Sequence, residues 1–236
     1  MRLSERLAAV AACVSQGSVL CDVGCDHGYL PIALVLEGSI PKALSMDINE
    51  GPLKNAEANI ASYGLSDRIR TRLSDGLEAM MPHEADTICI SGMGGRLIRR
   101  IISDNIEKAM SAKEWVFEPQ SDVGSVREFL FDTGVAIVDE DMVKERGSYY
   151  PVIKVDTTRV FDEIDSGLLP EDRACYIEFG PILLRNRHPL LIEYLTKESD
   201  RIYSIINSKP GPDTKRISEL EDRLQLVSRA IEIVGR

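Results

Sequence analysis

The first two thirds of the chain alternate between short apolar runs and longer mixed stretches. Five of the runs have the length and the apolar, β-branched content of buried strands. They lie at residues 18–23, 42–46, 68–73, 87–90 and 114–117. Helix-like stretches follow the first two runs, at residues 30–36 and from Asn49 onward. Since buried strands that alternate with helices form parallel sheets, the pattern predicts an α/β fold with a Rossmann-like, doubly wound, mostly parallel sheet.

The C-terminal third has the periodicity of paired helices. Its apolar residues recur at steps of three and four, which is a heptad seam. The seam comprises Ile217, Leu220, Leu224, Val227, Ile231 and Val234, and a looser stripe upstream comprises Leu191, Leu195, Ile202 and Ile205. Between the two lies Ser-Lys-Pro-Gly-Pro at residues 208–212, which would end one helix and reverse the chain.

These patterns predict two domains. Residues 1–160 would contain the sheet, and residues 161–236 an antiparallel helical hairpin with coiled-coil character. Dimerisation through the heptad seam is the alternative. Because each helix has about three heptads or fewer, a pair within one chain is the more economical arrangement, and we expect a monomer.

The turn after the first strand combines glycines with acids. It reads Asp-Val-Gly-Cys-Asp-His-Gly-Tyr-Leu-Pro from Asp22 to Pro31. Gly24 and Gly28 would let the backbone approach a ligand, and α/β sheets bind ligands beyond the carboxyl ends of their strands. A dinucleotide fingerprint requires glycine where Asp26 stands. Because carboxylates repel a pyrophosphate and attract cations, the turn favours S-adenosylmethionine, with its sulfonium and ammonium groups, over NAD.

Acids also follow the second and third strands. Asp47 stands about twenty residues beyond the first turn, where a carboxylate can accept hydrogen bonds from ribose hydroxyls. Asp75, followed by Gly76, could accept one from an adenine amino group. Each acid alone is more simply a helix cap or a turn residue, but three strand ends in series favour a cofactor site. We assign to it Asp22, Gly24, Asp26, Gly28, Tyr29, Asp47, Asp75, Gly76 and Gly92.

A glycine-rich segment follows the fourth strand. Residues 92–95, Gly-Met-Gly-Gly, leave little side chain to pack, so we expect a loop that presents its backbone to a ligand. A tight strand-to-helix connection is the plainer alternative. Gln120, at the exit of the fifth strand, has an amide able to read a base edge. The predicted substrate contacts are Met93, Gly94, Gly95, Arg96, Arg99, Arg100 and Gln120.

Together these segments resemble the bacterial tRNA adenine-N1 methyltransferases that modify adenine 22. The matching residues are 22–31, Glu50-Gly51-Pro52, Asp75-Gly76-Leu77, 92–95 and Phe179-Gly180-Pro181, and the likeness covers essentially the whole chain. The family usually has Gln-Pro-Asn at Glu118-Pro119-Gln120 and Tyr-Glu at Tyr150-Pro151. The resemblance implies a class I methyltransferase fold, S-adenosylmethionine as cofactor, tRNA as partner, and a C-terminal appendage that helps to grip tRNA.

Such a reaction asks little covalent chemistry of the protein. Methyl transfer from a sulfonium to adenine N1 is an in-line displacement, so positioning can supply much of the rate. The product base is cationic, and a carboxylate near its N1 and N6 edge would stabilise that charge or accept an N6 proton. Asp26 is the first catalytic candidate and His27 the second. His27 could stack on a base or relay a proton, or it could equally do no more than bond to backbone.

Net charge opposes an RNA partner, but its distribution does not. The formal charge is -10, whereas residues 185–236 carry ten Lys and Arg against eight acids. The basic residues expected to contact tRNA there are Arg185, Arg187, Arg201, Lys215 and Arg216. With Arg96, Arg99 and Arg100, they would place positive charge in two regions of the chain.

Cysteine usage and hydropathy limit the class of protein further. The five cysteines are odd in number, lack paired spacing and lie in or beside apolar runs, so they predict buried, reduced thiols and neither disulfides nor a metal site. No stretch resembles a membrane span or a signal peptide. The sequence therefore predicts a cytoplasmic protein without metal or membrane partners.

Two other functions fit part of these features. A methyltransferase of the same fold could act on another RNA, a protein or a small molecule, and would bind S-adenosylmethionine without depending on tRNA. A noncatalytic tRNA-binding module would bind RNA without transferring a methyl group. The sequence favours tRNA methylation because the first turn and the glycine-rich segment are both intact.

Overall fold

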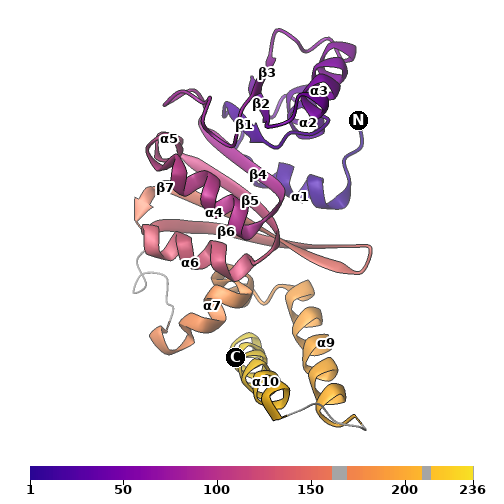
Figure 1. The fold of residues 1–236 in the computed structure, drawn as a ribbon, viewed down its shortest axis with the longest axis vertical. Coiled ribbons are helices and arrows are strands. Elements are labelled where there is room, and N and C mark those ends of the chain that lie inside the picture. Colours follow the sequence, from indigo (N-terminus) through magenta and orange to yellow (C-terminus); the bar gives the residue numbers. More distant parts are fainter. Residues whose placement is uncertain (161–168, 209–213, 236) are drawn as a thin grey trace. The chain divides into compact units, whose positions relative to one another are not determined.

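The chain is organised as two compact units, Met1–Phe161 and Asp162–Arg236. The computed structural model describes residues 1–160, 169–208 and 214–235 (Figure 1). The prolines and the glycine of the turn expected at residues 208–212 lie outside the described residues.

The N-terminal unit contains a seven-stranded sheet in the order β3-β2-β1-β4-β5-β7-β6. The strands are β1 (Leu20–Val23), β2 (Ala43–Asp47), β3 (Ile69–Leu73), β4 (Thr87–Gly94), β5 (Glu114–Ser121), β6 (Val135–Glu145) and β7 (Ser148–Val160). Strands β1 to β5 pair in parallel, while β7 runs antiparallel to β5 and β6. The strand order reverses between β1 and β4, where sheets of this kind bind ligands. This topology confirms the predicted Rossmann-like, mostly parallel α/β fold.

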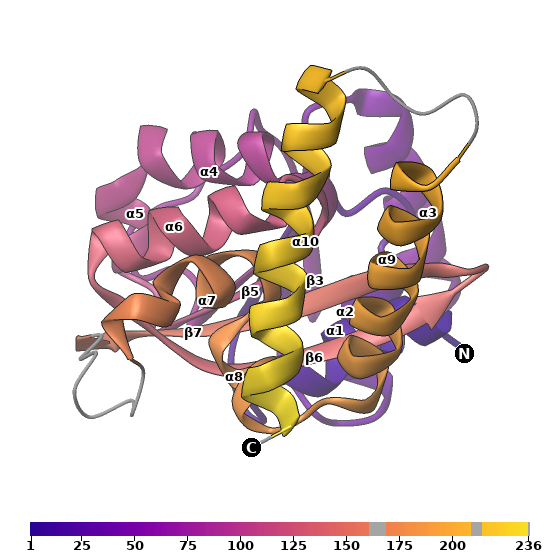
Figure 2. The same cartoon turned by 90° about the horizontal axis from the view of Figure 1, so that it is seen from below.

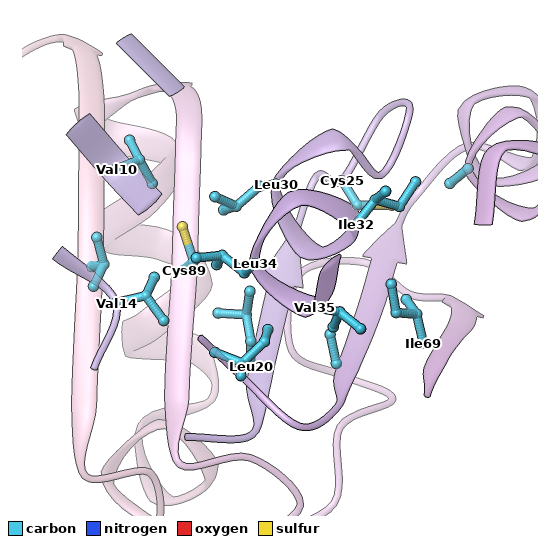
Figure 3. Close-up of a cluster of buried hydrophobic side chains, with 14 of the residues drawn as sticks. Val10, Val14, Leu20, Cys25, Leu30, Ile32, Leu34, Val35, Ile69 and Cys89 are labelled. Carbon is cyan, nitrogen blue, oxygen red and sulfur yellow. The ribbon is translucent and has the colours of Figure 1, made fainter. Parts of the chain in front are cut away.

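Helices of this unit pack on the sheet and enclose its core. They are α1 (Glu5–Cys13), α2 (Tyr29–Leu36), α3 (Glu50–Ser62), α4 (Gly95–Asp104), α5 (Ile106–Met110) and α6 (Val123–Thr133). Figure 3 shows one buried cluster, in which side chains of α1 and α2 such as Val10 and Leu34 meet Leu20 of β1 and Cys89 of β4. Helix α2 is buried from Leu30 to Val35, as its apolar run predicted.

The glycine-rich segment is not the open loop that the sequence predicted. Strand β4 continues through Gly94, pairs Ser91 with Glu118 and Met93 with Pro119, and is interrupted by irregular register on both sides of Met93. Gly92 has φ +77°, a left-handed conformation that suits glycine at such a bulge. The loop prediction was wrong because β5 also continues, through Ser121, and offers the partner strand. The plainer alternative of a direct strand-to-helix connection is correct from Gly95 onward.

The cysteines are free and buried, as predicted. Desolvation by burial raises the pKa of the Cys13 thiol to about 12 and that of Cys175 to about 11. Because the thiolate is the reactive form, these thiols are poor nucleophiles at neutral pH.

Within residues 1–160, 169–208 and 214–235, no cluster of three or more His, Cys, Asp or Glu side chains is arranged to hold a metal ion. Nor does any helix in those ranges combine the length and the apolar character that crossing a bilayer requires.

The C-terminal unit is helical. After a short 3-10 turn at Pro170–Asp172 it contains α7 (Arg173–Phe179), α8 (Pro181–Arg185), α9 (Pro189–Ile206) and α10 (Thr214–Gly235). Helices α9 and α10 lie side by side and antiparallel (Figure 2). This arrangement confirms the predicted helical hairpin.

The buried stripe of α10 differs from the predicted heptad seam in one turn. Leu220, Val227 and Val234 are buried as expected, but Ile231 is 39% exposed and Ala230 is buried instead. Helix α10 contacts α7 and α8 as well as α9, so its buried surface is wider than a two-helix seam. The prediction was therefore wrong at Ile231.

Candidate active site

A pocket of about 520 Å³ lies at the switch point of the sheet. Its lining comprises residues 1–4, Arg6, Leu7, Asp22, residues 24–27, Tyr29, Leu30, Ser91, Gly92 and Gln120. The turn after β1 thus meets the extended ends of β4 and β5. The volume is in the usual range for small-molecule sites.

The turn after β1 is held in a strained but well-connected conformation. Gly24, Asp26 and Gly28 all have positive φ, at +75°, +47° and +69°. The amides of Gly24 and Cys25 donate to the carbonyl of Met46 at 2.8 and 3.0 Å, which ties the turn to the end of β2. Because glycine has no Cβ, the Met93 side chain packs directly against Gly24. The absence of a side chain at Gly24 therefore lets the end of β4 pack against the turn.

Two buried acids lie behind this turn. Asp22 is buried in the floor of the pocket, and burial, followed by the nearby charge of Asp47, raises the pKa of its carboxyl to about 7. Asp47 accepts hydrogen bonds from the amides of Asn49 at 2.9 Å and Asp26 at 3.4 Å. Because burial and the charge of Asp47 disfavour ionisation of Asp22, a cationic ligand group beside these acids would be stabilising.

An acid and two aromatic rings lie at the pocket mouth. The Asp26 side chain is 68% exposed, and its Oδ1 lies 3.6 Å from Nε2 of His27. The imidazole stacks on the Tyr29 ring with centroids 5.2 Å apart and planes 17° from parallel. Asn59 of α3 donates to the His27 carbonyl at 2.9 Å and fixes the turn from the other side. The mouth therefore offers a flat aromatic surface beside a reachable carboxylate.

The structure brings only part of the predicted site into the pocket lining. The predicted residues that line it are Asp22, Gly24, Asp26, His27, Tyr29, Gly92 and Gln120. Asp47 and Gly28 belong to the turn and its support but do not line the pocket. Asp75 is exposed at the end of β3, and Gly76 packs against Ile101 of α4. Asp75 and Gly76 therefore follow the end of β3 and do not line the pocket.

The predicted substrate residues on β4 and α4 fall outside the pocket lining. Met93 packs on Gly24, and Gly94 lies beside the Ser121 hydroxyl. Arg96 is exposed and 3.3 Å from Asp122, while Arg99 lies over the Phe129 ring at 6.0 Å from its centroid. Arg100 is exposed on the same helix. The three arginines form a surface strip rather than part of the cavity.

Gly95 makes the closest backbone approach at this end of the sheet. A Cβ there would lie 2.5 Å from the Asp122 carbonyl oxygen and 2.8 Å from that of Ser121. We expect Gly95→Ala to lower the free energy of unfolding by about 1–3 kcal/mol, because backbone atoms cannot give way as a flexible side chain can. Urea denaturation of the purified variant measures this.

Gly51 supplies the matched control for that substitution. It lies in the first turn of α3 with no atom within 4 Å of an added Cβ. Gly51→Ala should therefore be neutral or stabilising by up to about 1 kcal/mol. Equal midpoints for the two variants would contradict the packing argument at Gly95.

The N-terminal wall of the pocket was not predicted from the sequence. Residues 1–4 with Arg6 and Leu7 of α1 form it. Ser4 caps α1 by accepting from the Leu7 amide at 3.2 Å, and Arg6 forms a 2.7 Å ion pair with Glu118 of β5. The Ser4 cap was a readable signal for the helix, but an arginine in a first helical turn does not by itself indicate a pocket.

Part of the basic surface expected in the C-terminal unit is neutralised. Arg201 forms an ion pair with Glu198 at 2.8 Å, and Arg216 with Glu219 at 3.1 Å. Pairing along one helix face offsets their charge, so these arginines have less positive charge available for binding phosphates. The expected positive region is therefore weaker than the residue count suggested.

The strand order, the acid-and-glycine turn after β1 and the pocket at the switch point define a class I methyltransferase domain. Residues 3–153 match a family model described as a methyltransferase domain. The chain is 31% identical to the tRNA (adenine(22)-N(1))-methyltransferase of Bacillus subtilis (strain 168), and the comparison covers 98% of each chain. The chain belongs to the family of tRNA (adenine(22)-N(1))-methyltransferases.

Solved structures agree over the same length. The B. subtilis m1A22 tRNA methyltransferase TrmK superposes with a TM-score of 0.83 at 30% identity, covering 98% of this chain and 99% of that one. M. capricolum TrmK, solved in complex with S-adenosyl-homocysteine, gives a TM-score of 0.84 at 28% identity, covering 99% and 100%. The likeness therefore includes the C-terminal helices as well as the sheet.

Proposed function

We propose that this protein transfers the methyl group of S-adenosylmethionine to N1 of adenine 22 in tRNA, and that it does so in the cytoplasm. The observation that carries the proposal is the 31% identity to a methyltransferase of that specificity over 98% of both chains. The cofactor product bound to the M. capricolum relative supports the cofactor assignment. Because the relatives match this chain across both of its units, the likeness supports a role for both units in this function.

The pocket fits such a cofactor. The buried Asp22 carboxyl offers a partner for an ammonium group, Gly24 lines the pocket with backbone alone, and Gly28 gives the turn its positive φ. Asp47 is the proposed ribose contact, Asp75 with Gly76 the proposed adenine contact, and Gly92 a further contact at the end of β4. When bound, S-adenosylmethionine supplies the methyl group as an electrophile; the protein's task is to position it.

Asp26 supplies the proposed catalytic carboxylate, because an adenine base that arrives from solvent can reach it. The side chains of Asp22 and Asp47 are buried, whereas that of Asp26 is exposed at the pocket mouth. Its carboxylate would stabilise the positive charge that develops on the adenine. The stacked His27 and Tyr29 rings would receive an extruded base on their flat surface.

The remaining proposed RNA contacts lie around the mouth and on the surface. Gln120 lines the pocket and would read the base edge, and the β4 end would approach the nucleotide backbone. These contacts comprise Met93, Gly94, Gly95, Arg96, Arg99, Arg100 and Gln120 on the N-terminal unit. Because Gly95 is enclosed by backbone, its contribution is to bring α4 close to β5.

Cofactor affinity should depend on pH through Asp22. A carboxyl with a raised pKa of about 7 holds its proton more tightly in the folded protein, so its contribution to stability falls as pH rises toward 7. A bound ammonium favours the ionised carboxylate, so cofactor binding releases this proton. We expect the Kd for S-adenosylmethionine to be about tenfold higher at pH 6 than at pH 8. Isothermal titration calorimetry in buffers of different ionisation enthalpy measures both affinity and proton release.

Asp22→Asn is the control for that pH dependence. The variant should bind the cofactor weakly at every pH and should release no proton near neutrality. A pH dependence retained in Asp22→Asn would assign the effect to another group and contradict the role of Asp22.

Methyl incorporation tests the proposed function directly. Labelled S-adenosylmethionine is supplied with tRNA unmodified at adenine 22 and with the same tRNA carrying guanine there. We expect transfer to the first and none to the second. Transfer to both tRNAs would show that the methylated base is a nucleotide other than adenine 22. Cofactor binding without transfer to any tRNA would favour another substrate or a noncatalytic RNA-binding role.

A further inference from the structure

The pocket has walls of opposite charge. Asp22 and Asp26 line the side formed by the turn after β1, while Arg2 and Arg6 line the side formed by the N-terminal segment. The acidic side suits the cationic groups of the cofactor. The basic side suits an anionic group, and the function proposed above assigns nothing to it.

Arg6 is held in place from three directions. Its Nη1 donates to Oε2 of Glu118 at 2.7 Å, and its guanidinium lies 5.6 Å from the centroid of the Tyr150 ring. Its Nε is 3.9 Å from Oε2 of Glu145. The Arg6 side chain is nevertheless 24% exposed, and Arg6 is one of the residues that line the pocket. An anchored yet accessible guanidinium loses little conformational freedom when it binds a ligand.

Glu118 connects this guanidinium to Gly92, which also lines the pocket. Its side chain is fully buried, and the oxygen that accepts from Arg6 also accepts from the Gly92 amide at 2.8 Å. Gly92 has no side chain to cover the guanidinium; a Cβ there would lie 3.6 Å from Nη1. The carboxylate thus orients Arg6 and the pocket-lining end of β4 together.

Most of the hydrogen-bonding capacity of Arg6 remains available. A guanidinium has five N–H donors in a planar fork. Within residues 1–160, 169–208 and 214–235, Arg6 donates one side-chain hydrogen bond, from Nη1 to Glu118. The remaining donors match an oxyanion, which a guanidinium binds through two parallel hydrogen bonds.

We propose that Arg6, oriented by Glu118, is an oxyanion-binding residue of the active-site pocket. This inference rests on the proposed function and adds a binding role for the N-terminal helix. The oxyanion has two possible sources within the reaction, the α-carboxylate of S-adenosylmethionine and a phosphodiester of the tRNA nucleotide at the site. Both present the same chemistry to a guanidinium, and binding measurements separate them.

The experiment compares Arg6→Met with a double variant, Arg6→Met with Glu118→Gln. The double variant removes the buried charge that the single substitution would leave without its cation, while the side-chain carbonyl of the introduced glutamine can still accept from the Gly92 amide. Arg70→Met, at an exposed position in β3 that does not line the pocket, is the matched control. Thermal melting of each variant establishes that it is folded.

Three ligands are titrated into each folded variant: S-adenosylmethionine, its decarboxylated form, and tRNA at several salt concentrations. If Arg6 binds the carboxylate, affinity for S-adenosylmethionine falls about 10- to 100-fold while that for the decarboxylated form hardly changes. If Arg6 binds a phosphate, tRNA affinity falls and the slope of log K against log salt becomes less negative by about one. Arg70→Met should show neither change.

Two results would overturn the proposal. One is unchanged affinity for all three ligands in the double variant. The other is an equal loss for S-adenosylmethionine and its decarboxylated form without any change for tRNA, which would make Arg6 a structural residue only. Wild-type protein that binds neither cofactor nor tRNA would instead contradict the proposed function, so the two failures are distinguishable.

Discussion

Asparagine in place of Asp26 is expected to lower kcat for tRNA methylation by about 100- to 1,000-fold. The substitution removes the carboxylate proposed to stabilise the positive charge on the adenine and leaves the proposed cofactor contacts at Asp22 and the glycine turn in place. The Kd for S-adenosylmethionine should therefore change by less than about threefold, since the proposed binding and charge-stabilising roles belong to different acids. Single-turnover methyl transfer and calorimetric titration measure the two quantities separately.

The choice of asparagine separates charge from backbone conformation. Asp26 has φ +47°, a region that asparagine tolerates and most other residues do not. Asp26→Ala would mix loss of charge with strain in the turn. His27→Gln tests the second candidate and should cost less than Asp26→Asn if the carboxylate is the catalytic group. A kcat for Asp26→Asn within about threefold of wild type would remove Asp26 from the mechanism.

Methionine in place of Arg127 is expected to lower the free energy of unfolding by about 3–5 kcal/mol. Arg127 of α6 and Glu140 of β6 are both buried, and Nε of the first lies 2.7 Å from Oε1 of the second. The substitution leaves a buried carboxylate whose guanidinium partner has gone. Urea denaturation followed by circular dichroism measures the loss.

A double variant distinguishes charge from packing at this pair. Arg127→Met combined with Glu140→Gln removes both charges and should recover a substantial part of the stability lost in the single variant. If the double variant were as unstable as the single one, the loss would come from packing of the arginine stem. Neither residue of this pair lines the pocket, so the cofactor affinity of the folded fraction should be unchanged.

The sheet and its glycine turn could be predicted from the sequence because their signals are local. Buried strands such as Leu20–Val23 show as short apolar runs, and the all-apolar α2 follows directly after Gly28. The positive φ of Gly24 and Gly28 is a property that glycine itself makes favourable. The antiparallel hairpin of α9 and α10 was predictable for the same reason, since its heptad spacing lies within single helices.

The errors and omissions arise where distant segments meet. Whether the glycine-rich segment is loop or strand depends on how far β5 runs beside it, and residues 92–95 do not contain that information. Arg6 belongs to the pocket only because α1 brings it to Glu118, 112 positions away in the sequence. Ile231 was misplaced because α10 packs on α7 and α8 in addition to its hairpin partner. In each case tertiary contacts decide among locally acceptable alternatives.

The burial of the native thiols makes this chain suitable for spectroscopic labelling. Desolvation keeps all five native cysteines protonated at neutral pH, so maleimide or nitroxide reagents would modify them slowly. A cysteine introduced at an exposed position of α10, such as Glu221, would react far faster. Paired labels at Glu221 and at the exposed Arg70 would then report the separation of the helical hairpin from the sheet, with and without tRNA, in a protein that keeps all its native cysteines.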